Sequence, residues 1–146
     1  MKQLSILETF GLAQPDEIRI FETKMGVELP EYFKFFLADQ NPFVVSEKNY
    51  IKGNRSFEVH HFYPLHADAE LSLMMVNSVL KDHFNGSFVV FADDSGGWLY
   101  ILSVRKEDYG KVYFCRMDEE LENALTLLAD SFEEFINGLA EEEIID

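Results

Sequence analysis

The stretch from Phe88 to Leu102, FVVFADDSGGWLYIL, constrains the fold of this chain more than any other part of it. Two apolar runs flank a turn made of two aspartates followed by Ser-Gly-Gly, which is the pattern of a β-hairpin. The runs Phe88 to Ala92 and Trp98 to Val104 are apolar on both faces. Strands of that kind lie in the middle of a sheet. The sequence therefore predicts a sheet with this hairpin near its centre.

Two helices are predicted ahead of the hairpin. Pro15 can begin the first and Gly26 can end it in a left-handed conformation, and its apolar positions follow helical spacing at Ile18, Phe21 and Met25. Pro30 can begin the second, and Asn41-Pro42 ends it. The apolar stripe of the second helix consists of Tyr32, Phe33, Phe36 and Leu37.

Further elements follow along the chain. Alternating residues predict a strand from Phe57 to Tyr63, and Lys111 to Cys115 predicts another. Asp68 is a candidate cap for a helix between them, with Leu71, Met74, Met75 and Val79 turned to the core. Ser131 and Glu134 fit a capping box for a closing helix, whose buried face is Phe132, Phe135, Ile136 and Leu139.

The order of these elements is typical of an α+β fold with a largely antiparallel sheet, since most strands are adjacent in sequence and the helices flank them. A chain of 146 residues is the length of one domain, so we expect residues 1–146 to form a single domain. About 68–70% of the unfolded surface can be buried at this size, and therefore neither disulfides nor a metal is needed for stability.

Charge and cysteine content limit the partners and the cellular compartment that we expect for this chain. The chain has 27 acidic and 12 basic residues, a formal net charge of −15. That charge repels phosphate backbones and anionic lipids, so we expect neither nucleic acid nor membrane as partner. It either favours encounter with a basic protein surface or serves only to keep the protein soluble. A lone cysteine, Cys115, together with the absence of a signal peptide or an apolar run of spanning length, predicts a cytoplasmic protein.

Four segments in this order resemble the SUKH superfamily. They are MGVELPEYFKFFL (Met25 to Leu37), the hairpin Phe88 to Leu102, GKVYFC (Gly110 to Cys115) and ADSFEEFINGL (Ala129 to Leu139). The resemblance runs from about Asp16 to Leu139. It implies a curled sheet flanked by helices.

The superfamily includes fungal glucan-synthesis regulators and many bacterial immunity proteins. The resemblance therefore implies a non-catalytic protein that binds and neutralises a cognate toxin. Many such toxins attack nucleic acids and carry basic surfaces, which agrees with the acidity of the chain. A regulatory adaptor of the glucan-synthesis type is the alternative, and we expect a monomer or a weak homodimer. The sequence departs from the family after the second helix, where Asn41-Pro42-Phe43 stands in place of a frequent Asn-Gly.

The hairpin turn supplies the candidate partner-binding residues Asp93, Asp94, Ser95, Trp98 and Tyr100. Loops held by a rigid sheet often carry recognition, and Trp and Tyr are enriched in binding hot spots. Trp98 and Tyr100 share one face of their strand, which is either a partner surface or ordinary core. A hydrolase that uses Asp93 and Asp94 as paired carboxylates is a remote alternative, because adjacent residues at a strand end point in different directions. The Ser-Gly-Gly sequence lacks the lysine and spacing of a phosphate-binding loop.

The remaining chemistry-bearing residues predict no cofactor and no metal. His60, His61, His66 and His83 lack the spacing of a metal motif, and on a strand His60 and His61 would point to opposite faces. Cys115 stands on an apolar strand with no charge nearby that would activate its thiol. We therefore expect no enzyme activity.

Overall fold

The computed structural model describes residues 2–66 and 70–142. Its helices are α1 (Pro15–Met25), α2 (Glu31–Asp39), α3 (Leu73–Val79), α4 (Lys81–Phe84), α5 (Leu121–Ala124) and α6 (Phe132–Asn137). Its strands are β1 (Ile6–Thr9), β2 (Pro42–Val45), β3 (Asn49–Lys52), β4 (Arg55–Glu58), β5 (His61–Phe62), β6 (Phe88–Asp93), β7 (Leu99–Ser103), β8 (Val112–Cys115), β9 (Leu125–Ala129) and β10 (Leu139–Ala140).

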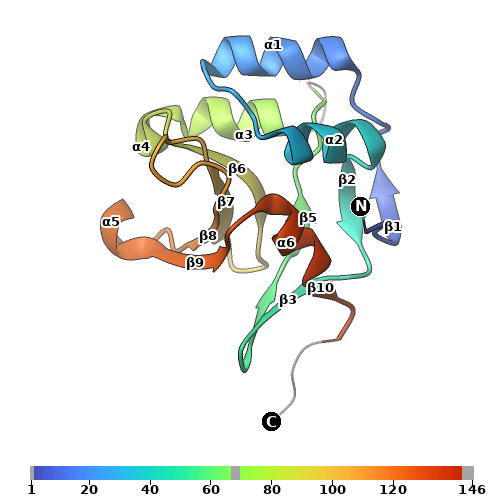
Figure 1. The fold of residues 1–146 in the computed structure, drawn as a ribbon, viewed down its shortest axis with the longest axis vertical. Helices are drawn as coiled ribbons and strands as arrows, with labels where there is room; N and C mark the ends of the chain where they lie inside the picture. The colour runs from blue at the N-terminus through green and yellow to red at the C-terminus, as the bar shows by residue number, and fades with distance from the viewer. Residues whose placement is uncertain (1, 67–69, 143–146) are drawn as a thin grey trace.

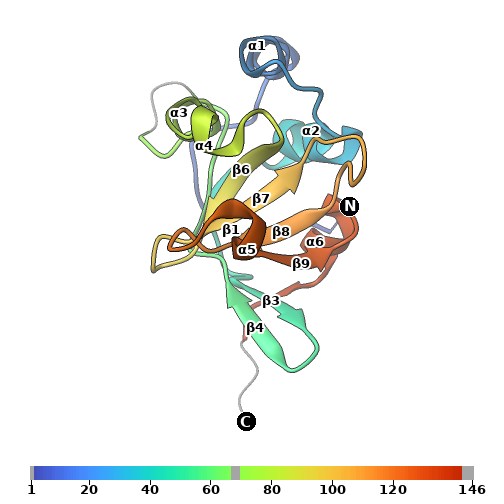
Figure 2. The same cartoon turned by 90° about the vertical axis from the view of Figure 1, so that its left-hand side faces the viewer.

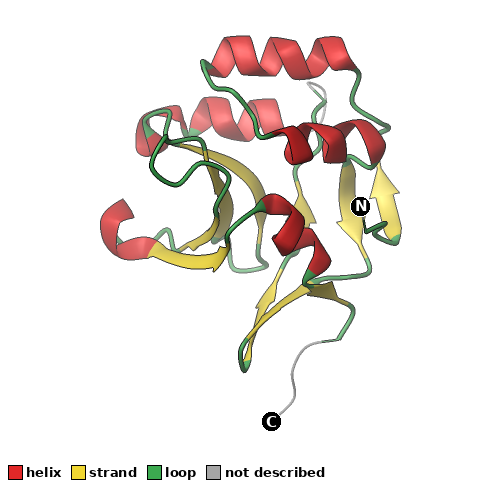
Figure 3. Cartoon of the chain, in the orientation of Figure 1, coloured by secondary structure: helices red, strands yellow, loops and turns green. Residues whose placement is uncertain are grey.

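The described strands form three antiparallel sheets, with the orders β1-β2, β10-β3-β4 and β5-β6-β7-β8-β9. The hairpin β6–β7 lies inside the five-stranded sheet, as its two-sided apolar pattern predicts. The α+β class and the antiparallel pairing are confirmed. The expectation of one curled sheet is replaced by separate sheets, which Figure 3 shows beside the helices.

The elements are distributed unevenly along the molecule. Helix α1 lies at one end, above α2 and α3, and the β3–β4 hairpin lies at the opposite end, where β3 pairs with β10 (Figures 1 and 2). The five-stranded sheet lies between them. Buried apolar residues of the helices and of all three sheets belong to one hydrophobic cluster.

Helices α1 and α2 agree with the sequence prediction. Gly26 ends α1 in the left-handed region, at φ 67°. Asn41, after α2, also has a positive φ of 44°, and Pro42 then begins β2. The Asn41 side chain is buried, donates to the Gly11 carbonyl oxygen at 2.8 Å and accepts from the Leu65 backbone N–H at 2.9 Å. These bonds hold the unusual turn that departs from the family pattern.

The predicted burial of α3 was partly wrong. The predicted cap Asp68 lies outside the described residues, and Ser72 caps α3 by accepting a hydrogen bond from the Met75 N–H. Met75 is 48% exposed and Val79 is 73% exposed, so neither belongs to the core. A start at Leu73 places Leu73 and Asn77 on the buried face instead.

Asn77 completes the hydrogen bonding of β6. Its amide oxygen accepts from the Val90 N–H at 2.8 Å, and its amide nitrogen donates to the Val90 carbonyl at 2.9 Å. Strand β5 is only two residues long and pairs with Asp93 and Ala92. The side chain of Asn77 therefore takes the place of a strand residue where β5 does not reach.

The predicted strand Phe57 to Tyr63 is two strands in different sheets. Strand β4 pairs with β3, whereas β5 pairs with β6. Between them, the Val59 N–H donates to Lys48 and the His60 N–H donates to Asp93, so the chain crosses from one sheet to the other within two residues. The short strands β1, β2, β3, β9 and β10 were not predicted.

Aromatic side chains fill the space between the five-stranded sheet, α2 and α6. Phe91 lies at a register irregularity of β6, between Val90 and Ala92. Its ring centroid is 5.2 Å from that of Phe132 and 5.4 Å from that of Phe135, both nearly edge-on. Such edge-to-face pairs are the favoured packing of aromatic rings.

The closing helix α6 has a variant of the predicted cap. Ser131 Oγ accepts from the Glu134 N–H at 3.1 Å, as predicted. The Glu134 carboxylate accepts from the Asp130 N–H at 3.0 Å rather than from that of Ser131. Two free donors near the helix start are thereby satisfied.

Burial predicts how α6 and α3 respond to truncation. Phe135→Ala should lower the free energy of unfolding by about 3–5 kcal/mol, because it leaves a cavity among rings. Ser131→Ala should cost about 1 kcal/mol through the lost cap. Val79→Ala should change stability by less than about 0.5 kcal/mol, since Val79 is exposed. Urea unfolding of the three variants measures these differences, and a large loss for Val79→Ala would contradict the assigned face of α3.

Candidate partner-binding surface at the β6–β7 turn

The turn between β6 and β7 is held by the side chain of Asp94. Its Oδ1 accepts from the Gly96 N–H at 2.9 Å and from the Trp98 N–H at 2.8 Å. The Asp94 N–H donates to the Trp98 carbonyl at 2.9 Å, which closes the hairpin. An aspartate that bonds to backbone groups ahead of it is a common way to fix a turn. The turn is therefore ordered by its own residues.

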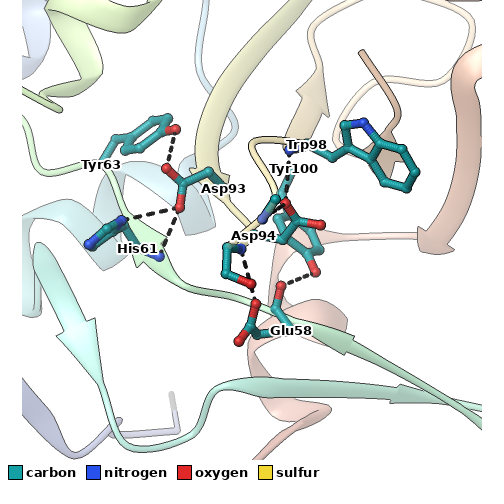
Figure 4. A network of polar contacts seen from close by, with 9 residues as sticks. Glu58, His61, Tyr63, Asp93, Asp94, Trp98 and Tyr100 are labelled. Carbon is teal, nitrogen blue, oxygen red and sulfur yellow. Dashed lines mark hydrogen bonds and ion pairs between the residues drawn. The ribbon is translucent and has the colours of Figure 1, made fainter. Parts of the chain in front are cut away.

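Asp93 faces a different set of partners (Figure 4). Its Oδ2 accepts from the Tyr63 hydroxyl at 2.8 Å. Its Oδ1 accepts from the His61 backbone N–H at 3.1 Å and lies 3.3 Å from His61 Nδ1. The Asp93 side chain is 13% exposed. It therefore joins β5 to β6 rather than facing a partner.

Glu58 of β4 was missed by the sequence analysis, although it contacts the turn. Its Oε1 accepts from the Ser95 N–H at 3.0 Å, and its backbone carbonyl accepts from the Tyr100 hydroxyl. Hydrogen bonds from Ser95 lower the pKa of Glu58. These contacts join the three-stranded sheet to the turn of the five-stranded sheet, and no local sequence pattern could have predicted a pairing of residues so far apart in the chain.

The remaining predicted site residues divide between surface and core. Ser95 is exposed, and Trp98 is half-buried with its ring 5.8 Å from that of Phe114. Tyr100 has no accessible surface, so it supports the site from within. Phe114 also contacts Phe57, at 5.4 Å between centroids.

Arg55 of β4 extends this surface. It is exposed, and its guanidinium carbon lies 4.5 Å from the centre of the Phe57 ring. Trp98 and Arg55 are thus linked through Phe114 and Phe57. Both residue types are frequent in binding hot spots. We define the turn surface as Arg55, Glu58, Asp94, Ser95 and Trp98.

The arrangement does not resemble a paired-carboxylate active site. Asp93 and Asp94 bond to different groups, as expected for neighbours at a strand end. Burial, together with the charge of nearby aspartates, raises the pKa of Tyr63, so its phenol is a hydrogen-bond donor rather than a base. Paired carboxylates act as acid and base only when both can reach one substrate atom.

Cys115 is buried and His61 is partly buried, whereas His60 and His83 are exposed. The rings of His60 and His61 contact each other at 4.0 Å, which corrects the expectation of opposite faces, and the His61 ring stacks on Phe43 at 4.6 Å. Within residues 2–66 and 70–142, no three His, Cys, Asp or Glu side chains are grouped as metal ligands. Burial raises the pKa of the Cys115 thiol to about 11, which keeps it protonated at neutral pH.

A second polar cluster surrounds Asp108 in the β7–β8 connection. Its carboxylate accepts from the Ser103 and Tyr113 hydroxyls and from the Arg105 guanidinium, and its side chain is 9% exposed. Burial raises the pKa of Asp108, but the hydrogen bonds from Arg105, Ser103 and Tyr113 outweigh it and bring the value down to about 2. The Asp108 carboxylate already accepts hydrogen bonds from three side chains. We therefore interpret the cluster as part of the fold and not as a ligand-binding site.

The lowered pKa of Asp108 predicts loss of stability in acid. The ionised form is favoured in the folded state, so its contribution is present above about pH 4 and is lost as the pH falls towards 2. Between these pH values the wild-type protein should lose about 2 kcal/mol more than Asp108→Asn. Urea unfolding across this range measures the difference, with Asp118→Asn, an exposed carboxylate, as control. Parallel pH profiles for wild type and Asp108→Asn would contradict the assignment.

Comparison with known proteins agrees with the resemblance noted in the sequence. In the part of the chain that the structure describes, no helix combines the length and apolar composition that a bilayer crossing requires. No curated protein matches the chain. The model of the SMI1 / KNR4 family (SUKH-1) matches residues 12–138, which include both helices of the first third, the central hairpin and α6. The chain therefore belongs to the SMI1 / KNR4 family (SUKH-1).

Proposed function

We propose that this protein is a non-catalytic immunity protein that binds a toxin and blocks it, and that the turn surface makes the contact. The family includes immunity proteins and Smi1/Knr4 regulators. The observation that carries the proposal is an exposed turn whose backbone is already fixed by Asp94, beside a half-buried tryptophan. A surface ordered before binding loses little conformational entropy when a partner arrives.

The charge distribution supports a basic partner. The register of Asp93 with Leu99, of Leu99 with Cys115 and of Cys115 with Leu125 shows that the β6–β7 turn and the β8–β9 connection leave the same end of the sheet. The β8–β9 connection carries the exposed carboxylates Asp118, Glu119, Glu120 and Glu122. With a net charge of −15, this end can steer a basic surface towards the turn.

The proposed inhibition is by binding alone, without a chemical reaction at the turn. Its carboxylates are committed to backbone and tyrosine donors, so they hold shape and charge instead of performing proton transfer. Trp98 and Arg55 supply the contact area that slows dissociation. The toxin would be blocked by occupation of its basic substrate-binding surface.

Capture and rescue test the biological role. The protein purified from its native host should carry a toxin domain with a basic surface, and co-expression of the two chains should restore growth that the toxin alone arrests. Purified protein should hydrolyse neither esters nor nucleotides. Capture of cell-wall or signalling proteins without any protection from a toxin would contradict the immunity role and favour a regulator.

Two substitutions, each checked for folding, test the turn surface. Asp94→Asn keeps an oxygen that can accept from Gly96 and Trp98 but removes the charge, so association should slow and its salt dependence should weaken. Trp98→Ala should mainly accelerate dissociation. Glu141→Gln makes the same charge change at an exposed position near the C-terminus and should leave both rates unchanged.

Surface plasmon resonance at two salt concentrations separates the two rates. Thermal midpoints within about 2–4 °C of wild type establish that each variant is folded. A folded Asp94→Asn and a folded Trp98→Ala that both bind with wild-type rates would exclude the turn surface as the contact.

A further inference from the structure

Strand β9 ends the five-stranded sheet, and within the described residues no strand pairs with its outer edge. The Arg116 N–H donates to the Ala124 carbonyl at 3.0 Å, which sets the alternation of the β8–β9 ladder. The N–H and C=O groups of Thr126 then face β8, whereas those of Leu125 and Leu127 point away from it. An outer edge of this kind can accept another strand.

Side chains of β3 cover only part of that edge. Lys52 Nζ donates to the Leu127 carbonyl at 2.6 Å, and the Tyr50 hydroxyl donates to the Leu128 carbonyl at 2.9 Å. The part of the edge that these β3 side chains cover therefore begins at the Leu127 carbonyl and continues towards α6. The N–H and C=O of Leu125 and the N–H of Leu127 lie before it, at the end next to α5.

The open end of β9 adjoins a surface depression. A hollow of about 360 Å³ is lined by Phe88, Arg105, Glu120, Leu121, Glu122 and Leu125. Leu125 belongs to both features, because its backbone lies on the edge and its side chain lines the hollow. A strand laid along β9 would place an apolar side chain within reach of this hollow.

The acidic residues near β9 indicate which kind of incoming strand would bind there. Glu120 and Glu122 are exposed at the rim of the hollow, and Asp118 precedes them. Asp130 follows β9 and is 73% exposed. Two nearby carboxylates have basic partners of their own, since Arg116 pairs with Glu119 and Lys111 lies 3.7 Å from Asp130. Glu120 and Glu122 therefore favour lysine or arginine on an incoming segment.

We infer that the outer edge of β9, from Leu125 to Leu127, binds an extended basic segment of another protein by strand addition. Backbone hydrogen bonds would supply the affinity, and the hollow with its two glutamates would select alternating apolar and basic side chains. This surface is separate from the turn surface, and the inference does not rest on the proposed role against a toxin.

A short peptide serves as the probe. The acetylated and amidated pentapeptide Lys-Val-Lys-Val-Lys should bind with a dissociation constant on the order of 0.1–1 mM and should shift the amide signals of Leu125 and Leu127 in NMR titration. The same peptide methylated on its internal amide nitrogens has equal charge but cannot pair as a strand. It should bind about tenfold more weakly. Equal affinity of the two peptides, or no binding near 2 mM, would overturn the inference.

Variants of the protein separate backbone pairing from charge. Leu127→Pro removes an N–H that points away from β8 and should abolish peptide binding, whereas Leu127→Ala keeps that N–H and should bind as wild type. Glu120→Gln with Glu122→Gln should weaken binding several-fold at low salt. Glu141→Gln with Glu142→Gln, the same charge change on exposed residues beyond β10, should not. Wild-type affinity in a folded Leu127→Pro protein would overturn the inference.

Two further outcomes are distinguishable. Asp94→Asn should leave peptide binding unchanged, so failure of the turn surface and failure of the β9 edge are seen separately. Sedimentation of the protein alone should show no dimer that depends on this edge. A dimer that Leu127→Pro abolishes would overturn the inference in favour of a second copy of the chain.

Discussion

Phe91 occupies the volume on which the rest of the architecture depends. It is buried at the irregularity of β6 and contacts rings of α2 and α6 as well as Tyr100 of β7. A bulge re-aims side chains and bends its strand, which lets one phenylalanine meet two helices and the neighbouring strand. Because interiors are close-packed, the helices cannot shift independently of this ring. The position of the β6–β7 turn follows from the same packing, since β6 ends only two residues later, at Asp93.

Carboxylates in this chain have two distinct uses. Asp93, Asp94 and Asp108 accept hydrogen bonds that hold strands and turns, and Glu47 does the same by accepting from the N–H and hydroxyl of Ser5. The carboxylates before and within α5 are exposed and place negative charge at the surface. A net charge read from the sequence does not distinguish these uses. Asparagine is the informative replacement for aspartate here, because it preserves an acceptor while it removes the charge.

Sequence reasoning succeeded where pattern and local structure agree. The hairpin, α1, α2 and α6 have strong periodicity or caps, and the structure contains each of them. One residue differs, because Leu139, expected on the buried face of the closing helix, lies in β10 after α6 has ended at Asn137. The short strands β1, β3 and β9 have weak patterns, because each is completed by side chains or strands from distant parts of the chain. The buried face of α3 was predicted wrongly because the cap was expected at Asp68. The helix instead begins after Ser72, which changes the residues that face the core.

The candidate site was predictable to a similar extent. The turn residues were found from the hairpin pattern. Glu58 and Arg55 were not, because they belong to another sheet, and Glu58 stands 37 residues before Ser95 in the chain. Tyr100 was placed among the contacts because alternation cannot tell a covered face from an open one. Its hydroxyl bonds to the Glu58 carbonyl, so a residue expected to contact a partner is buried and joins two sheets.

Asn77 has a consequence for how the sheet can change over time. By occupying both backbone groups of Val90, one amide on α3 closes the outer side of β6 just beyond the end of β5. A side chain does not offer the repeating backbone donors and acceptors that a strand offers, so this side cannot serve as a template for further strands. A further strand, whether from a bound chain, an inserted segment in a related sequence or aggregation of a damaged molecule, is therefore excluded from this stretch of β6. Beyond the end of β5, the backbone of β6 is therefore terminated by a helix side chain rather than by a strand.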